Sequence, residues 1–247
     1  MDPATFPLSG LVDALASDER FGAFVEAFPA NARVSEPALP LLLATLHDVL
    51  ERALVCLFAE DEEARDVADA VGWYTDPARV ALLPSRGVRA GSGLEPPAHL
   101  VGERVRALDV LARGGVVCVS ARALAEGMPA ASDRPELVRL ARDDGAGLDG
   151  LVQALALAGS ERVERVEERG QIAVRGGLVD IFPSTGREPL RVEFFGDEIE
   201  QIRAFSPFTQ RALHPVDAAV VFPAREATRS AAEIGRASCR ERVFRVV

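Results

Sequence analysis

The residues best suited to binding chemistry belong to the sequence RVEFF, at positions 191–195. Successive side chains of a β-strand point to opposite faces of its sheet. Val192 and Phe194 therefore share one face, and Arg191, Glu193 and Phe195 share the other. Because the first of these faces is wholly apolar, we expect it to join the core and Phe195 to lie near solvent. An exposed aromatic side chain beside arginine on a rigid strand has the composition of a protein-binding hot spot.

A second arginine, Arg175, precedes this strand in the same stretch of sequence. The alternative to a binding role is that Arg175 and Arg191 pair with Asp180, Glu193 or Glu198 on a solvated sheet face. Such exposed pairs contribute little to stability. Asp180 is expected to serve structure, by bonding a turn or by pairing an arginine. Residue types and spacing alone leave both interpretations of the arginines open.

No spacing of histidines or cysteines predicts a catalytic or metal site. Cys56 and Cys118 lie inside apolar runs, where a free thiol behaves as a small core residue, and no CxxC or Cys/His ligand pattern occurs. The acidic run at 60–66 is expected to form the solvated start of a helix, where negative charge suits the helix dipole. The full set of histidines and cysteines is His47, His99, His214, Cys56, Cys118 and Cys239.

Composition excludes several classes of protein. The chain has 247 residues, of which 48% are hydrophobic and 27% charged, with a net charge of −10. It can therefore bury a core, but it lacks the excess of basic charge that drives sequence-independent nucleic-acid binding. The N-terminus does not have the pattern of a signal peptide, and no apolar run approaches the roughly 20 residues that span a bilayer. We expect a cytoplasmic protein with no membrane contact.

The first half of the chain alternates helix and strand patterns. Short apolar runs separated by helices indicate a parallel sheet covered on both faces. The Gly- and Pro-rich stretch 84–99 must be a loop. The predicted strands are 54–58, 80–83 and 116–120, and the predicted helices are 38–52, 60–72 and 101–113.

The second half changes character after about residue 122. Residues 132–147 are polar and turn-prone, and 148–158 predict a short helix ended by Gly159. From Gln171 onward the pattern is strand, turn, strand, with Gly176–Gly177 and Gly196–Asp197 as candidate two-residue turns. The predicted fold class is therefore α/β with a parallel-sheet domain, followed by a small α+β domain with an antiparallel sheet.

The same stretch resembles the N-terminal region of the bacterial transcription-repair coupling factors, the Mfd family. The second domain of that family is similar to domain 2 of the excision-repair subunit UvrB. The matching words are AVRGGLVDIFP, RVEFFGDEIEQIRAF and SPFTQR, at 173–183, 191–205 and 206–211. Weaker correspondence extends from about residue 50 to 226.

The resemblance implies a domain organisation. Residues 1–122 would form a UvrB-like domain 1a, a degenerate P-loop-NTPase-like domain. Residues 123–212 would form domain 2, and 213–232 would begin domain 1b. Residues 233–243 coincide with one reading frame of a common sequencing adaptor. We therefore expect the tail 233–247 to be foreign to the natural protein and exclude it from the fold.

The resemblance also locates a missing nucleotide site. UvrB carries a P-loop ahead of its first long helix, with glycines that cradle phosphates and a Lys-Ser/Thr pair. The equivalent stretch here, 32–46, contains no glycine and no lysine, and it includes two prolines and Glu36. We expect no ATP and no metal ion to bind this chain. In the full-length family, ATP and Mg²⁺ belong to motor domains that this chain lacks.

The resemblance implies that domain 2 binds the repair ATPase UvrA, and Arg175, Arg191 and Phe195 match the binding residues of the family. The planar fork of an arginine can engage a partner carboxylate through two hydrogen bonds. The whole family protein acts on stalled RNA polymerase and double-stranded DNA through other domains. Two alternatives remain: a UvrB-type damage-binding subunit, and an unrelated α/β enzyme with a small-molecule site.

Overall fold

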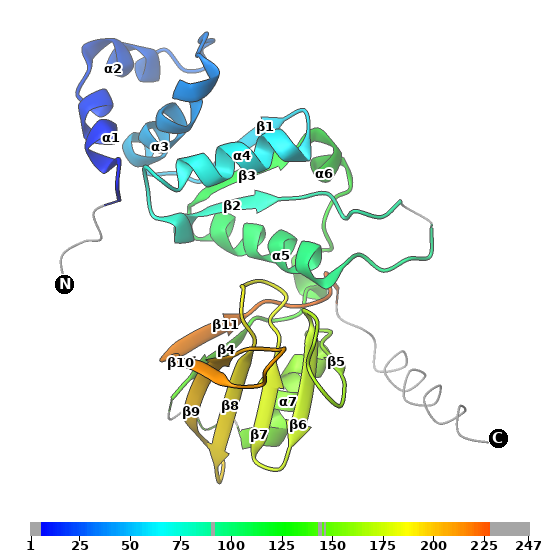
Figure 1. Cartoon of the computed structure of the whole chain (residues 1–247). Coiled ribbons are helices and arrows are strands. Elements are labelled where there is room, and N and C mark those ends of the chain that lie inside the picture. Colours follow the sequence, from blue (N-terminus) through cyan, green and yellow to red (C-terminus); the bar gives the residue numbers. More distant parts are fainter. Residues whose placement is uncertain (1–5, 90–91, 143–144, 146, 228–247) are drawn as a thin grey trace. The chain divides into compact units, whose positions relative to one another are not determined.

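The computed structural model of the chain describes residues 6–89, 92–142, 145 and 147–227 (Figure 1). These residues fall into two compact units, unit 1 within 1–92 and 103–127 and unit 2 within 93–102 and 128–247. Unit 1 contains a parallel sheet, and the larger sheet of unit 2 is mainly antiparallel. The α/β and α+β classes predicted from the sequence are confirmed.

Unit 1 begins with two short helices that the sequence did not predict, α1 (Ser9–Ala16) and α2 (Glu19–Glu26). Asp18 caps α2, since its carboxylate accepts the backbone N–H groups of Arg20 and Phe21. A 3₁₀ turn, η1 (Glu36–Ala38), then leads into α3 (Leu39–Leu50), which was predicted as 38–52.

The parallel sheet of unit 1 matches the three predicted strands. Its order is β1-β3-β2, and β3 is central and buried along its whole length. Figure 1 shows α4 and α5 on the two sides of this sheet, and α5 begins three residues earlier than the predicted 101–113. The bounds are β1 (Leu54–Phe58), α4 (Asp61–Val71), η2 (Pro77–Arg79), β2 (Val80–Leu83), α5 (Ala98–Ala112), β3 (Val116–Ser120) and α6 (Ala121–Ala125).

A carboxylate ties together the carboxyl ends of the three strands. Asp61, at the start of α4, accepts hydrogen bonds from the hydroxyl of Ser120 at 2.6 Å and from the backbone N–H and hydroxyl of Ser85. Burial opposes the charge of Asp61, but the hydrogen bonds from Ser120 and Ser85 outweigh it and lower its pKa below the ordinary value. The acidic run at 60–66 does start a helix, as predicted, and Asp61 also serves as a structural link.

The six-stranded sheet of unit 2 has the order β10-β9-β8-β7-β6-β5 (Figure 1). Its inner face packs on α7, with Leu151 and Leu155 of the helix in one cluster with Val179, Val192 and Ile202 of the strands. The bounds are α7 (Gly147–Leu157), β5 (Glu161–Arg162), β6 (Gln171–Arg175), β7 (Leu178–Ile181), β8 (Leu190–Phe195), β9 (Glu198–Phe205) and β10 (Ala212–Pro215).

Both predicted two-residue turns are present. Arg175 pairs with Leu178, and Phe195 pairs with Glu198, so each hairpin closes over two residues. The first turn residue is glycine in both, with φ of 58° at Gly176 and 63° at Gly196. A positive φ at this position favours glycine and matches the twist of the flanking strands.

The stretch 132–147 corrects one expectation, because it contains a strand. A 3₁₀ turn, η3 (Ala131–Asp133), opens it and agrees with its turn-prone pattern, but strand β4 (Val138–Ala141) was not predicted. β4 pairs antiparallel with β11 (Ala218–Val221), about eighty positions further along the chain. The strand was missed because its partner is remote in sequence and its apolar pattern spans only two buried residues, Val138 and Leu140.

The predicted family domains 1–122, 123–212 and 213–232 stay a prediction. The compact units differ from them in part, since 93–102 packs with unit 2 and β11 pairs with β4 inside that unit. The tail predicted at 233–247 lies outside the described residues. In the part of the chain that the structure describes, no helix has the length and apolar character needed to cross a bilayer.

Replacing Asp61 by Asn should lower the free energy of unfolding of unit 1 by about 2 kcal/mol at pH 7, because charge-assisted hydrogen bonds are lost. The folded-state pKa is lowered, so the stabilisation is complete above the unfolded pKa of about 4 and is lost as pH falls through the lower, folded value. Urea unfolding followed by fluorescence of Trp73, the single tryptophan, measures this difference. The difference in the free energy of unfolding between the wild type and Asp61→Asn should become smaller at about pH 3. A difference that does not change with pH would contradict the structural role of the Asp61 carboxylate.

Candidate functional site

The strand register of unit 2 brings Arg175, Arg191 and Phe195 onto one face of the sheet. Arg175 lies opposite Leu178, which lies opposite Glu193 on β8. Glu193 is two residues from both Arg191 and Phe195, so all of these side chains leave the sheet on the same side. This side, the outer face, is opposite the face that packs on α7.

The three predicted residues are near neighbours on the outer face. A strand spacing of about 4.8 Å and a rise of about 3.3 Å per residue place their Cα atoms about 12–13 Å apart. One partner segment can therefore contact all three.

The side chain of Phe195 projects into solvent. It is 78% exposed, while its neighbour Phe194 packs against the inner core. The two-residue turn that follows holds the end of β8 in a fixed hairpin. The prediction from the sequence RVEFF, that Phe194 faces the core and Phe195 faces solvent, is confirmed.

Arg191 has a more constrained environment than the sequence suggested. Its Nε and Nη2 donate to Oδ1 and Oδ2 of Asp180 at 2.7 and 2.9 Å, and its guanidinium lies 4.8 Å from the centre of the Phe205 ring. Asp180 and Phe205 are both buried. The hydrogen bonds to Asp180 raise the pKa of Arg191 above its ordinary value. Asp180 therefore pairs an arginine, one of the two roles expected for it.

The pair with Asp180 occupies one edge of the Arg191 guanidinium. It uses an N–H group of Nε and one of Nη2. Of the five guanidinium N–H groups, two on Nη1 and one on Nη2 remain, and Nη1 meets no acceptor within the described part of the chain. Arg191 is therefore a fixed donor on the outer face, and its Nη1–Nη2 edge is left to receive a partner group.

The side chain of Arg175 is less constrained than that of Arg191. It is exposed at the end of β6, and its Nη2 donates to the backbone carbonyl of Glu164 at 2.7 Å. No carboxylate of the described residues pairs with it, so its other donors can engage a partner carboxylate.

Two further features of unit 2 were not predicted. Half-buried Arg203 lies opposite Arg191 on β9, and Phe208, in the loop after β9, is 88% exposed. Arg165 donates to the carbonyl oxygens of Pro207 and Phe208, which fixes that loop. Alternation along β9 does not place Arg203, because the register between β8 and β9 shifts and both Ile199 and Ile202 are buried. Its pairing with Arg191 depends on that register, which the local sequence does not give.

The stretch that would carry a P-loop is built differently. Residues 32–35 are irregular, and η1 and α3 follow with Pro37 and Pro40 in their first turns. Prolines offer no backbone N–H for phosphates. Glu36 adds negative charge at the same point, so the stretch does not fit a nucleotide.

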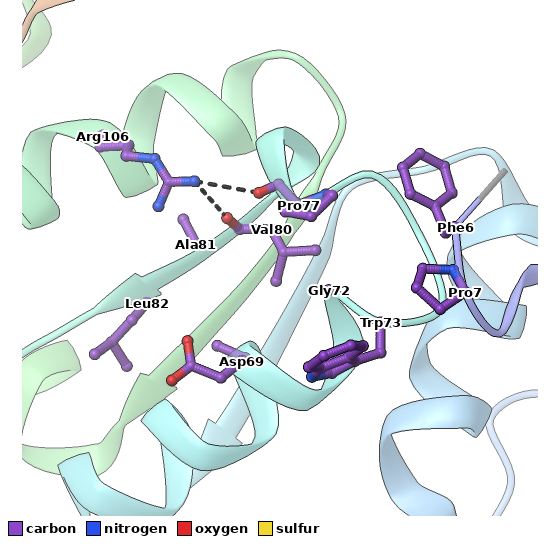
Figure 2. A pocket seen from close by; sticks show the side chains of 11 residues that line it. Phe6, Pro7, Asp69, Gly72, Trp73, Pro77, Val80, Ala81, Leu82 and Arg106 are labelled. Carbon is purple, nitrogen blue, oxygen red and sulfur yellow. Dashed lines mark hydrogen bonds between the residues drawn. The ribbon is translucent and has the colours of Figure 1, made fainter. Parts of the chain in front are cut away.

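A pocket of about 460 Å³ in unit 1 is one candidate small-molecule site (Figure 2). Figure 2 shows Trp73 and Phe6 on one side and Arg106 on the other. Arg106 is committed to structure, because its Nη2 donates to the carbonyl oxygens of Pro77 and Val80. The pocket lies at the amino end of β2, whereas open α/β sheets bind ligands at the carboxyl ends of their strands.

Two of the histidines have structural contacts. Nε2 of His47 lies 2.8 Å from the carbonyl oxygen of Gly114, and Nε2 of His214 lies 2.9 Å from a carboxylate oxygen of Glu188. These contacts correct the expectation that His47 and His214 are without partners. Cys118 faces Cys56 in register, and the contact with that thiol and burial both raise the pKa of Cys118. Among the described residues, no cluster of His, Cys, Asp and Glu could hold a metal ion; Cys239 lies outside them.

Replacing Asp180 by Asn should destabilise unit 2 by about 2 kcal/mol, because Arg191 loses its buried counter-charge. Breaking a fully buried pair costs more, about 3–5 kcal/mol, but Arg191 is partly exposed. Thermal unfolding followed by circular dichroism measures the loss. Glu198→Gln, at an exposed position of β9, is the control and should change little. Equal melting temperatures for Asp180→Asn and Glu198→Gln would show that the pair does not stabilise the sheet.

Comparison with known proteins agrees with this geometry. Residues 138–226, which include the whole outer face, match the UvrB interaction domain. The chain is 34% identical to the transcription-repair-coupling factor of Mycobacterium bovis over 89% of its own length and 19% of that protein. It is 34% identical to that of Myxococcus xanthus, over 75% of the chain and 16% of that protein. The UvrABC system protein B of Methanothermobacter thermautotrophicus is 35% identical over 47% of the chain and 18% of that protein.

The similarity to coupling factors covers both units, whereas that to the UvrABC protein covers less than half of the chain. The chain spans less than a fifth of the length of each of these relatives. It belongs to the transcription-repair-coupling factor family and corresponds to the N-terminal part, which contains the UvrB interaction domain.

Proposed function

We propose that this chain is a protein-interaction module that docks UvrA and thereby recruits nucleotide excision repair to RNA polymerase stalled at DNA lesions. The observation that carries the proposal is the outer face of unit 2. Within the matched UvrB interaction domain, it offers Arg175, Arg191 and an exposed Phe195 on one side of a rigid sheet.

Phe195 supplies the apolar part of the proposed contact. Burying a phenylalanine side chain in a partner pocket contributes about 1.5–3 kcal/mol. The side chain is held on a strand next to a two-residue turn, so little conformational freedom is lost when it binds.

The two arginines supply the polar part in different ways. Asp180 and Phe205 hold Arg191 in place, so it loses little conformational entropy on binding, and it presents its Nη1–Nη2 edge. Arg175 is exposed and can turn its free donors toward a carboxylate. The chain as a whole carries a net charge of −10, so this local arrangement of arginine favours an acidic protein surface over nucleic acid.

We further propose that unit 1 is a P-loop-NTPase-like domain without a nucleotide site. The parallel sheet and the proline-containing stretch 32–46 support this proposal. ATP, Mg²⁺, RNA polymerase and double-stranded DNA would then be bound by other domains of the full-length protein. In this proposal the chain itself has no catalytic role and no cofactor.

A UvrB-type subunit is the second candidate, since a UvrABC system protein B is among the relatives. That candidate requires a functional nucleotide site in unit 1, which the proposed function does not.

Replacing Arg175 and Phe195 together by Ala should weaken UvrA binding about 100-fold or more, since hot-spot residues each contribute about 2 kcal/mol. Isothermal titration of the purified chain with UvrA measures the affinity. Both side chains are exposed, so the melting temperature should stay within about 1 °C. Arg191→Ala is a poorer test, because it leaves Asp180 buried without its counter-charge.

The matched control for this test is Arg139→Ala with Leu157→Ala. It removes the same kinds of side chain from exposed positions on β4 and α7, away from the outer face. The control should bind as wild type does. Unchanged binding by the Arg175/Phe195 variant would refute the docking face.

Addition of 1 mM ATP with Mg²⁺ should leave the melting temperature of the chain unchanged. A site with a Kd near 10 μM would stabilise its unit by about 2.7 kcal/mol and raise its melting temperature by several degrees. Differential scanning calorimetry measures the shift, with Mg²⁺ alone as the reference. A rise that depends on ATP would favour the UvrB-type subunit or an enzyme.

A further inference from the structure

Arg203 occupies an unusual position on the outer face. It lies directly opposite Arg191 on the neighbouring strand, so two guanidinium side chains leave the sheet side by side. Like charges in register across two strands destabilise a sheet. Asp180 offsets the charge of Arg191 through two hydrogen bonds. Among the described residues, Arg203 has only a longer ion pair, with Glu193 at 3.8 Å.

The contacts of Arg203 within the sheet are incomplete. Its Nη2 donates to the side-chain oxygen of Gln201. The nearest carboxylate oxygen, from Glu193, is 3.8 Å from Nε, which is too far for a hydrogen bond. Nε is buried and has no hydrogen-bond partner among the described residues. A buried donor left without an acceptor costs free energy and calls for an explanation.

Two other buried side-chain atoms of the described residues also lack partners, Oε2 of Glu103 and Nε of Arg225. Each of the two side chains has an ion pair as long as that of Arg203: Glu103 lies 3.9 Å from Arg65, and Arg225 lies 3.7 Å from Glu95. Neither lies on the sheet of unit 2. Of the three, Arg203 alone shares a face with Arg175, Arg191 and Phe195.

We infer that Arg203 is a further docking residue, which receives a carboxylate or main-chain carbonyl oxygen of the partner between itself and Arg191. The inference rests on the proposed function. The Cα atoms of opposed residues in an antiparallel pair lie about 4.5–5.5 Å apart, so one acceptor group can reach Nη1 of Arg191 and a donor of Arg203. Binding then supplies the missing acceptor and offsets the repulsion between the two arginines.

A structural role for Arg203 and a docking role predict opposite effects on stability. If Arg203 holds the sheet together, its removal lowers the melting temperature. If it is a docking residue, Arg203→Gln removes the repulsion and the charged donor that lacks an acceptor. The melting temperature then stays level or rises, while affinity for UvrA falls.

The test is isothermal titration of UvrA into the wild-type chain, Arg203→Gln and Arg203→Lys, with melting temperatures measured in parallel. We expect Arg203→Gln to weaken binding about tenfold without lowering the melting temperature. Arg203→Lys keeps the charge and should lose less affinity. Arg139→Gln, at an exposed position of β4, is the matched control and should bind as wild type does.

Three outcomes would overturn the inference. Wild-type affinity in Arg203→Gln would remove Arg203 from the docking face and leave the proposed function standing. A lowered melting temperature together with weaker binding would assign Arg203 a structural role. If the wild-type chain does not bind UvrA at all, both the inference and the proposed function fail.

Discussion

The site depends on the fact that the sheet of unit 2 has only one face against the core. Val179, Val192 and Ile202 are fully buried against α7. Because side chains alternate along each strand, burying these residues forces their neighbours onto the opposite face. A shift of one residue in register would bring arginines into the core. The apolar packing therefore fixes the position of the arginines and of Phe195.

Within that outer face, the ion pair of Asp180 and Arg191 changes what the arginines can do. A buried carboxylate requires a partner, and Arg191 fulfils this need with N–H groups of Nε and Nη2. As a result, Arg191 is a rigid hydrogen-bond donor, and it lies beside Arg203, whose Nε has no hydrogen-bond partner among the described residues. Arg175 remains the more adaptable of the three. A surface that combines fixed and adaptable donors around one aromatic side chain suits specific recognition of a protein.

The sequence predicted the elements whose pattern is local. The runs at 54–58, 80–83 and 116–120 are continuous and apolar, and all three are strands with those bounds. The alternation of RVEFF likewise placed Phe195 correctly in solvent. β4 and the Arg191–Arg203 pair could not be predicted, because both depend on which strand lies alongside, and the helices α1 and α2 are only eight residues each. The link made by Asp61 was missed for the same reason, since its partners Ser85 and Ser120 come from separate strands.

The most direct measurement of the central claim is hydroxyl-radical footprinting of the chain with and without UvrA. Phe195 and Trp73 are 78% and 59% exposed, so both react in the free chain. If UvrA docks on the outer face, the oxidation rate of Phe195 should fall several-fold on binding while that of Trp73, in unit 1, stays the same. Protection of Trp73 with unchanged reactivity at Phe195 would contradict the account.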